Sequence, residues 1–115
     1  MRFLKNRFPA ATFHYHQWIE YNDASGHHFC EPELFVVLDD QIILFEVKLT
    51  GGEMGKRQLE GLYAPLLSFI FHRPVRCCLV CKWTTPDTPG PFFQTPDDFI
   101  LSRADFGTWH WLPHP

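Results

Sequence analysis

The stretch that decides the fold is EPELFVVLDDQIILFEVK, residues 31–48. It contains two apolar runs, 34–38 and 42–45, separated by Asp39 and Asp40. Short runs rich in Val, Ile and Phe are typical of buried strands. Consecutive aspartates are compatible with a turn. The stretch therefore predicts a β-hairpin.

The register of this hairpin follows from its turn. If the turn is centred between Asp39 and Asp40, the numbers of opposed residues sum to 79. Glu33 then lies opposite Glu46, and Glu31 lies opposite Lys48. Side chains alternate between the faces of a strand, so residues 31, 33, 46 and 48 share one face. A loop one residue longer or shorter would change this pairing and exchange the faces.

Two opposed carboxylates repel each other unless a proton or a cation lies between them. Directly opposed Cβ atoms are about 4.5–5.5 Å apart, close enough for Glu33 and Glu46 to share one ion. Oxygen ligands suit Mg²⁺ and Mn²⁺. The sequence therefore predicts a divalent metal site at this pair, with Lys48 supplying positive charge on the same face.

The same residues carry a family resemblance. Pro32-Glu33, twelve intervening residues and then Glu46-Val47-Lys48 resemble the signature of the PD-(D/E)XK nuclease superfamily. Residues 58–63, QLEGLY, are similar to the helix that carries a Gln and a Tyr after the core hairpin in many members. The resemblance covers about residues 18–83. It implies a restriction endonuclease-like α/β fold.

The resemblance also implies a function, the metal-dependent hydrolysis of phosphodiester bonds in DNA. Glu33 and Glu46 would bind Mg²⁺ or Mn²⁺, with the backbone carbonyl of Val47 as a further ligand. Lys48 would orient or deprotonate the attacking water, and Gln58 would contact phosphate or a bound water. A bound metal lowers the pKa of water, and a nearby lysine stabilises the charge of the transition state.

One departure from the family pattern concerns the start of the chain. Family members usually have a helix before the hairpin, often with another acidic residue facing the site. Here about 17 residues precede Trp18, and they do not show a clear helical pattern. Glu20, Asp23 and Glu31 are the candidates for that additional acid, and the sequence does not choose among them.

The remaining sequence predicts the elements around the hairpin. A further strand at 12–21 would join the two hairpin strands, roughly 28–38 and 41–49, in an antiparallel meander. A helix follows Glu53, with its apolar stripe at Leu59, Leu62, Tyr63, Leu66, Leu67 and Ile70. Pro65 should kink or split it. The helix lets a strand at 75–83 run parallel to 41–49. We expect a mixed central sheet flanked by helices, a short helix from Asp97 and a last strand near Trp109.

Cations near the start of the long helix are candidate phosphate contacts. Lys56 and Arg57 lie there, and a helix N-terminus attracts anions. An ordinary solvated face is the alternative interpretation. Residues 1–11 contain three further basic residues that could contact phosphates: Arg2, Lys5 and Arg7. The alternative is that this terminal arm only packs its phenylalanines on the core.

Composition limits the class of protein. The 115 residues support one domain, residues 1–115. The net charge of −3 excludes a broadly basic nucleic-acid binder but not a local basic patch. There is no apolar run of about 18 residues, so no membrane span is expected. The resemblance to compact Holliday-junction resolvases implies a homodimer or larger assembly.

The four cysteines favour a reduced, intracellular chain, because three of them cluster in one predicted strand and no signal peptide is visible. We interpret them as small buried apolar residues rather than as a metal cluster.

Two other functions remain open. The chain could be a catalytically inactive module with a nuclease fold that binds nucleic acid or protein. Alternatively, Glu31, Lys48 and Glu46 could form only an ion-pair network. An exposed pair of that kind contributes about 1 kcal/mol or less, and it gives no reason for a second opposed carboxylate.

Overall fold

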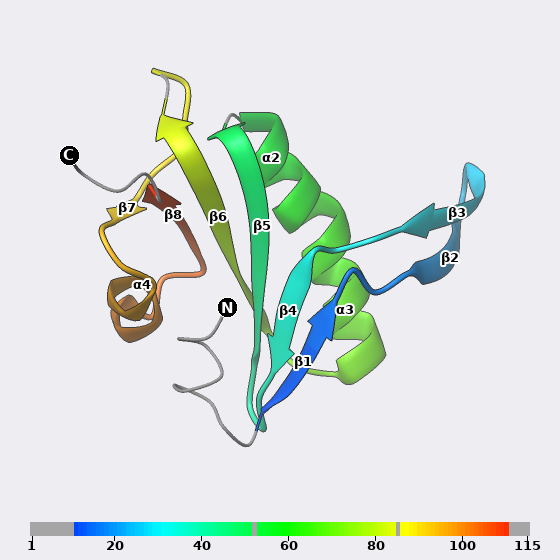
Figure 1. The fold of residues 1–115 in the computed structure, drawn as a ribbon. Helices are drawn as coiled ribbons and strands as arrows, with labels where there is room; N and C mark the ends of the chain where they lie inside the picture. Colours follow the sequence, from blue (N-terminus) through cyan, green and yellow to red (C-terminus); the bar gives the residue numbers. More distant parts are fainter. Residues whose placement is uncertain (1–10, 52, 85, 111–115) are drawn as a thin grey trace.

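The computed structural model describes residues 11–51, 53–84 and 86–110. Its centre is a six-stranded mixed sheet in the order β1-β4-β5-β6-β8-β7 (Figure 1). The expected α/β architecture, a mixed sheet flanked by helices, is confirmed. The strands of this sheet are β1 Thr12–Tyr15, β4 Leu34–Val37, β5 Ile42–Gly51, β6 Val75–Thr84, β7 Phe92–Phe93 and β8 Phe106–His110.

The β4–β5 hairpin has the predicted register. The two strands are antiparallel, and Leu34 pairs with Phe45 and Val37 with Ile42, so the paired numbers sum to 79. The turn is closed by a 2.8 Å hydrogen bond from the N–H of Leu38 to the carbonyl of Gln41. Both strands are buried because helices cover the two faces of the sheet.

The predicted three-stranded meander is wrong in one respect. Residues 12–21 divide into β1 and β2 (Ile19–Asp23), and residues 28–38 divide into β3 (Gly26–Cys30) and β4. The first break falls at His16, whose φ of 48° leaves the extended region. The second contains Pro32, which has no N–H for a sheet ladder. β1 still pairs with β4, whereas β2 and β3 form a separate hairpin that projects from the body (Figure 1).

The long helix covers one face of the sheet. It comprises α2 (Glu53–Gln58), a π-helical turn η1 (Leu59–Tyr63) and α3 (Ala64–Phe71). It continues through Pro65 without splitting, and the hydrogen bonding changes in the turn just before the proline, where the N–H of Ala64 bonds to the carbonyl of Leu59. This helix connects β5 to β6, and the two strands are parallel as expected.

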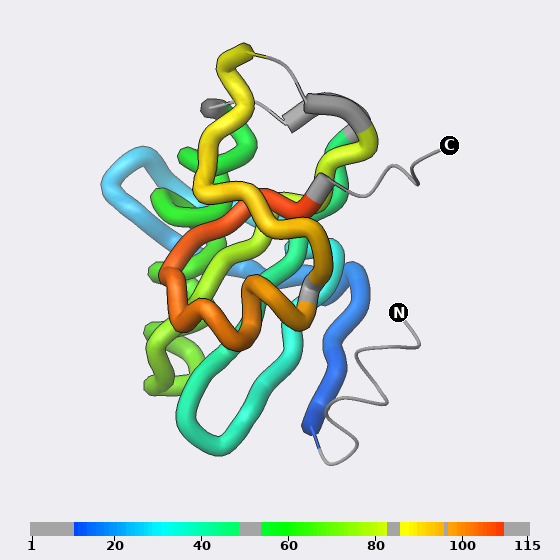
Figure 2. The backbone as a smooth tube through the Cα atoms, turned by 90° about the vertical axis from the view of Figure 1, so that its left-hand side faces the viewer, coloured from blue at the N-terminus to red at the C-terminus, as the bar shows by residue number. Residues whose placement is uncertain are grey.

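The second face of the sheet is covered by α4 (Pro96–Ser102), whose Phe99 packs on β4, β5 and β6. In Figure 2 the long helix lies on the left of the sheet and β1 on the right. The expected short helix and last strand are thus present, the latter as β8, parallel to β6.

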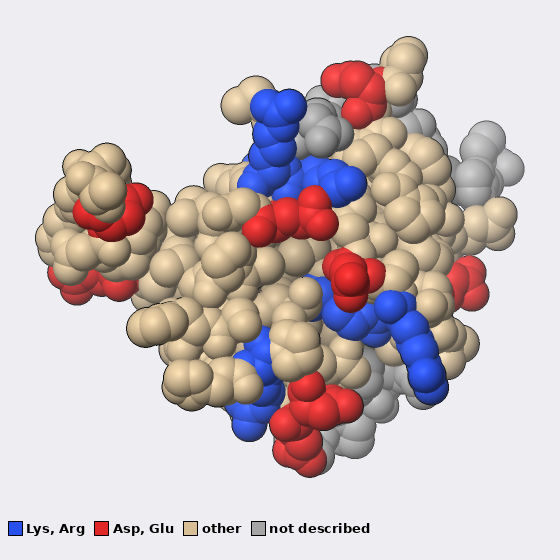
Figure 3. All heavy atoms as spheres, turned by 180° about the vertical axis from the view of Figure 1, so that it is seen from behind, with Lys and Arg blue, Asp and Glu red and all other residues tan. Residues whose placement is uncertain are grey.

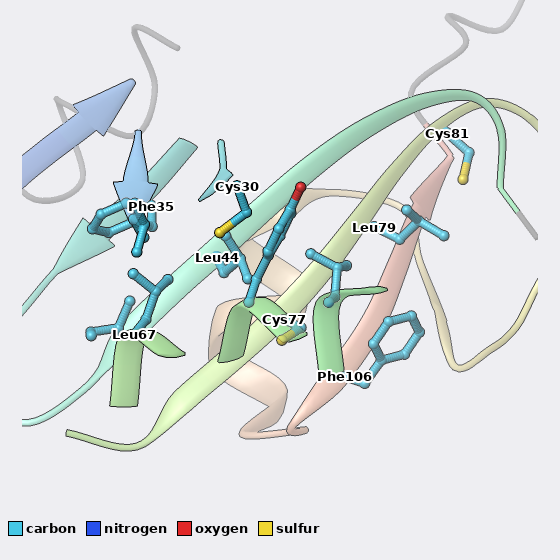
Figure 4. Close-up of a cluster of buried hydrophobic side chains, with 12 residues drawn as sticks. Cys30, Phe35, Leu44, Leu67, Cys77, Leu79, Cys81 and Phe106 are labelled. Atoms are coloured by element: carbon cyan, nitrogen blue, oxygen red, sulfur yellow. The ribbon is translucent and has the colours of Figure 1, made fainter. Parts of the chain in front are cut away.

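All four cysteines are buried, and none of them forms a disulfide. Cys77 belongs to the core under the long helix and Cys78 to the core under α4, so the two adjacent residues point to opposite faces of the sheet. Figure 4 shows Cys30, Cys77 and Cys81 among apolar side chains. Burial raises the pKa of the Cys77 and Cys78 thiols to about 12, so they remain protonated and behave as small apolar residues.

Within the described ranges, no helix is long and apolar enough to cross a membrane. The phosphate contacts expected from Arg2, Lys5 and Arg7 lie outside the described residues.

Candidate metal and catalytic site

The two predicted carboxylates meet where β4 begins. The backbone N–H of Glu33 donates to Oε2 of Glu46 at 3.4 Å, and the N–H of Val47 donates to Oε2 of Glu33 at 3.0 Å. Glu33 directly precedes β4, whereas Glu46 and Val47 continue β5 beyond its last pair with that strand. The structure therefore brings together three of the residues that the sequence selected.

The Val47 carbonyl faces the same side of β5 as Glu33, because the N–H and C=O of one strand residue point in the same direction. If the β4–β5 ladder continued by its register, Val47 would pair with residue 32. That residue is a proline, which has no N–H to donate to the carbonyl. Pro32 therefore cannot supply the ladder hydrogen bond to the Val47 carbonyl.

Lys48 lies on the same face as Glu46. Its Nζ is 3.9 Å from Oε1 of Glu46. The carboxylate of Glu31 instead pairs with His16, whose Nδ1 lies 3.1 Å from Oε1 of Glu31. Among the described residues, the Glu31–Lys48 ion pair expected from the register is absent, because β4 begins only at Leu34 and the Glu31 carboxylate pairs with His16.

The pKa of Glu46 is raised from 4.5 to about 6. Burial is the main cause, since 5% of the residue is exposed, and the charge of Glu33 adds to it. The hydrogen bond from the Glu33 backbone, Lys48 and His16 oppose the shift. These groups therefore offset only part of the effect of burial and of the neighbouring carboxylate on the pKa of Glu46.

Gln58 lies at the end of α2 and is half-buried. Its Nε2 donates a 3.1 Å hydrogen bond to Oη of Tyr63. In a regular α-helix, residues five apart point about 140° away from each other. The π-helical turn between them brings Gln58 and Tyr63 to one side of the helix.

Tyr63 lies beside Gln58, although the sequence did not select it as a candidate site residue. Burial and the nearby charge of Glu46 raise its pKa to about 12, so its hydroxyl stays protonated. The Gln–Tyr resemblance was the signal that could have identified it. The five-residue spacing of Gln58 and Tyr63 did not predict the contact, because the contact requires the π-helical turn.

The donor set fits a hard divalent ion. Mg²⁺ is commonly held by one or two carboxylates and keeps several waters. Two carboxylates and one carbonyl are available at Glu33, Glu46 and Val47. Across residues 11–51, 53–84 and 86–110, no three His, Cys, Asp or Glu side chains are grouped as a metal site. A metal here would therefore depend on the backbone carbonyl and on water.

Two of the proposed additional acids lie elsewhere. Glu20 and Asp23 are on the projecting β2–β3 hairpin, where they pair with His27 and His28 at 2.6 Å and 3.0 Å. Asp23 also accepts hydrogen bonds from Ser25 within the hairpin turn, so its carboxylate stabilises that turn. Glu31 is the candidate that remains beside Glu33.

The two candidate phosphate contacts differ in their surroundings. The Nζ of Lys56 lies 3.8 Å from Glu60 and over the ring of Phe106, 4.9 Å from its centroid. Arg57 is exposed. Seen from behind, basic side chains are interspersed with acidic ones (Figure 3). Arg57 is therefore better placed than Lys56 to contact a phosphate.

Comparison with known proteins gives one similarity of fold. No family profile matches the chain, and no curated protein matches it significantly. A solved structure, a repair endonuclease from Pyrococcus abyssi, is similar with a TM-score of 0.47 and 16% sequence identity. The match covers 97% of this chain and 44% of that protein, so the chain spans less than half the length of that endonuclease.

Proposed function

We propose that this protein is a metal-dependent nuclease that hydrolyses phosphodiester bonds in DNA. The observation that carries the proposal is the hydrogen-bonded arrangement of Glu33, Glu46 and Val47. It places two carboxylates beside a carbonyl without a ladder donor, within reach of Lys48. A plain ion-pair network would need neither a second carboxylate nor a backbone carbonyl without a ladder donor.

Each residue has a role in this proposal. Glu33, Glu46 and the Val47 carbonyl would hold Mg²⁺ or Mn²⁺, which supplies Lewis-acid polarisation of the phosphoryl group. Lys48 orients the attacking water and places positive charge where negative charge develops. Gln58, held by Tyr63, directs its amide toward the phosphate. Arg57 contacts the DNA backbone, with Lys56 as a weaker contributor. A homodimer would supply additional surface for a branched or recombination substrate.

The test is cleavage of a panel of labelled DNAs: single strand, duplex, flap and four-way junction. Each substrate is incubated with Mg²⁺, Mn²⁺ or EDTA, beside Lys48→Ala and Glu46→Gln. We expect cutting with metal, no cutting in EDTA and none with either variant. The matched control is Lys82→Ala, a half-buried lysine elsewhere on the sheet, which should cut as the wild type does. Metal-independent cutting, or a fully active Glu46→Gln, would show that the site is wrong.

A second candidate is a nuclease-fold module that binds DNA or a protein without cutting. The net charge of −3 and the engagement of Lys56 with Glu60 favour it. Thermal stability in Mn²⁺ separates the two, because a preformed metal site stabilises the folded state by mass action. Absence of both cutting and stabilisation at millimolar Mn²⁺ would favour the binding module.

A further inference from the structure

His16 lies in one row with the two carboxylates. In the β1–β4 pairing, the residue numbers of each opposed pair sum to 49. Continued by one residue, this register places His16 opposite Glu33. The N–H of His16 donates a 2.8 Å hydrogen bond to the carbonyl of Glu33, which extends the pairing one step beyond β1. The register of β4 and β5 continues the row from Glu33 to Glu46.

The His16 side chain also contacts the connector that carries Glu33. Its Nδ1 lies 3.1 Å from Oε1 of Glu31. An ionised carboxylate only accepts hydrogen bonds, so Nδ1 is the donor whether the imidazole is neutral or charged. One residue therefore holds both ends of Glu31-Pro32-Glu33, the first through its ring and the last through its backbone.

The backbone of His16 is constrained in a way that fits this role. Its φ of 48° lies in the left-handed region, which few residues other than glycine adopt, and histidine is among the more tolerant types. This conformation ends β1 and turns the chain toward the β2–β3 hairpin. Non-glycine residues held in such regions are often found near functional sites.

We propose that His16 is a positioning residue that fixes the Glu31–Glu33 connector, so that the Glu33 carboxylate faces Glu46 in a metal-ready geometry. This inference rests on the proposed function. The connector has no strand pairing of its own between β3 and β4, so its contacts with neighbouring elements set its position. Outer contacts of this kind typically change metal affinity by about 10- to 100-fold when they are removed.

The experiment measures Mn²⁺ affinity by titration calorimetry in wild type, His16→Gly, His16→Asn and Glu31→Ala. Glycine keeps the backbone N–H, accepts the positive φ and removes the ring. We expect it to weaken Mn²⁺ binding about tenfold or more. Asparagine tolerates the same φ and carries a donor, so it should recover most of the affinity. Glu31→Ala should equal His16→Gly, and the double variant should be no worse than either.

The matched control is His27→Ala, which breaks another exposed His–Glu pair, with Glu20 at 2.6 Å on the β2–β3 hairpin. It should leave Mn²⁺ affinity unchanged. In DNA cutting, His16→Gly should lower kcat with little change in KM. Wild-type Mn²⁺ affinity in His16→Gly, or equal losses in His16→Gly and His27→Ala, would overturn the positioning role alone. Failure of the wild type to bind Mn²⁺ would overturn the proposed function and, with it, this role.

Discussion

The backbone N–H of Glu33 donates a 3.4 Å hydrogen bond to the carboxylate of Glu46 on the neighbouring strand. This pair stands where the β4–β5 ladder ends. There the Glu46 carboxylate accepts from the N–H of Glu33, and the Glu33 carboxylate accepts from the N–H of Val47. A carboxylate used in this way keeps its second oxygen for another partner. The end of the ladder is therefore where the proposed metal site lies.

The first prediction concerns pH. The pKa of Glu46 is about 6 in the folded state and 4.5 in the unfolded chain. The folded state therefore keeps this proton at a higher pH than the unfolded chain does. The stability from this group is fully present below pH 4.5 and is lost as pH rises through about 6. The loss amounts to at most about 2 kcal/mol. Urea unfolding without metal from pH 4 to 8 measures it.

Glu46→Gln is the second prediction. The amide mimics the neutral acid and can still accept the Glu33 hydrogen bond, so the variant should be more stable than wild type at pH 8 by up to about 2 kcal/mol. It should also show no pH-dependent loss near pH 6 and no cutting. A destabilised but active variant would contradict both the burial of the charge and its role.

Lys48 gives the third prediction. Lys48→Ala should lower kcat by about 100-fold or more, because a positive charge is lost where the transition state gains negative charge. The free energy of unfolding should change by less than about 1 kcal/mol, since the ion pair is long and partly exposed. Single-turnover cutting and urea unfolding of the same preparation separate the two effects. Lys48→Arg keeps the charge and should recover part of the rate.

The fourth prediction compares two adjacent cations. Arg57→Ala should weaken binding to DNA of any sequence. It should also reduce the magnitude of the slope of log binding constant against log salt concentration by about 1. Lys56→Ala should have a smaller effect on binding, because that ammonium already contacts Glu60 and Phe106. Fluorescence anisotropy in Ca²⁺, to prevent cutting, measures both slopes. Equal slopes for the two variants would contradict this assignment.

Tyr63 provides the fifth prediction. Tyr63→Phe removes the acceptor for Gln58 while keeping the buried ring, so the free energy of unfolding should fall by about 1 kcal/mol. The Gln58 amide loses its direction, and kcat should fall several-fold with an unchanged Mn²⁺ affinity. Gln58→Ala should reproduce the loss in kcat, and the double variant should add nothing. Additive losses would show that the two side chains act separately.

Much of the sheet could be predicted from local patterns. The turn at Asp39 and Asp40 determined the β4–β5 register, because the length of the loop fixes which residues of the two apolar runs are opposed. The apolar stripe of the long helix and the parallel strand after it followed from periodicity and connection length. These signals are local, since each lies within a few residues of the element that it specifies.

The breaks in the strands could not be predicted in the same way. Residues 12–21 have strand-forming types throughout, yet the chain leaves the sheet at His16. The backbone there is set by contacts with Glu31 and Glu33, which are distant in sequence. The Gln58–Tyr63 contact could not be predicted either, because it depends on a π-helical turn that no residue pattern in the sequence indicated.

The sequence by itself determined that Glu33 and Glu46 are opposed, that Lys48 shares a face with Glu46, and that an amphipathic helix covers them. Two apolar runs, the position of the turn between them and the apolar stripe of the helix are sufficient for those statements. Only the tertiary structure decided that Glu31 pairs with His16, that Tyr63 contacts Gln58, and that the N–H of Val47 bonds to the Glu33 carboxylate. Those features arise where separate segments meet, so they depend on packing and hydrogen bonding between residues far apart in the chain.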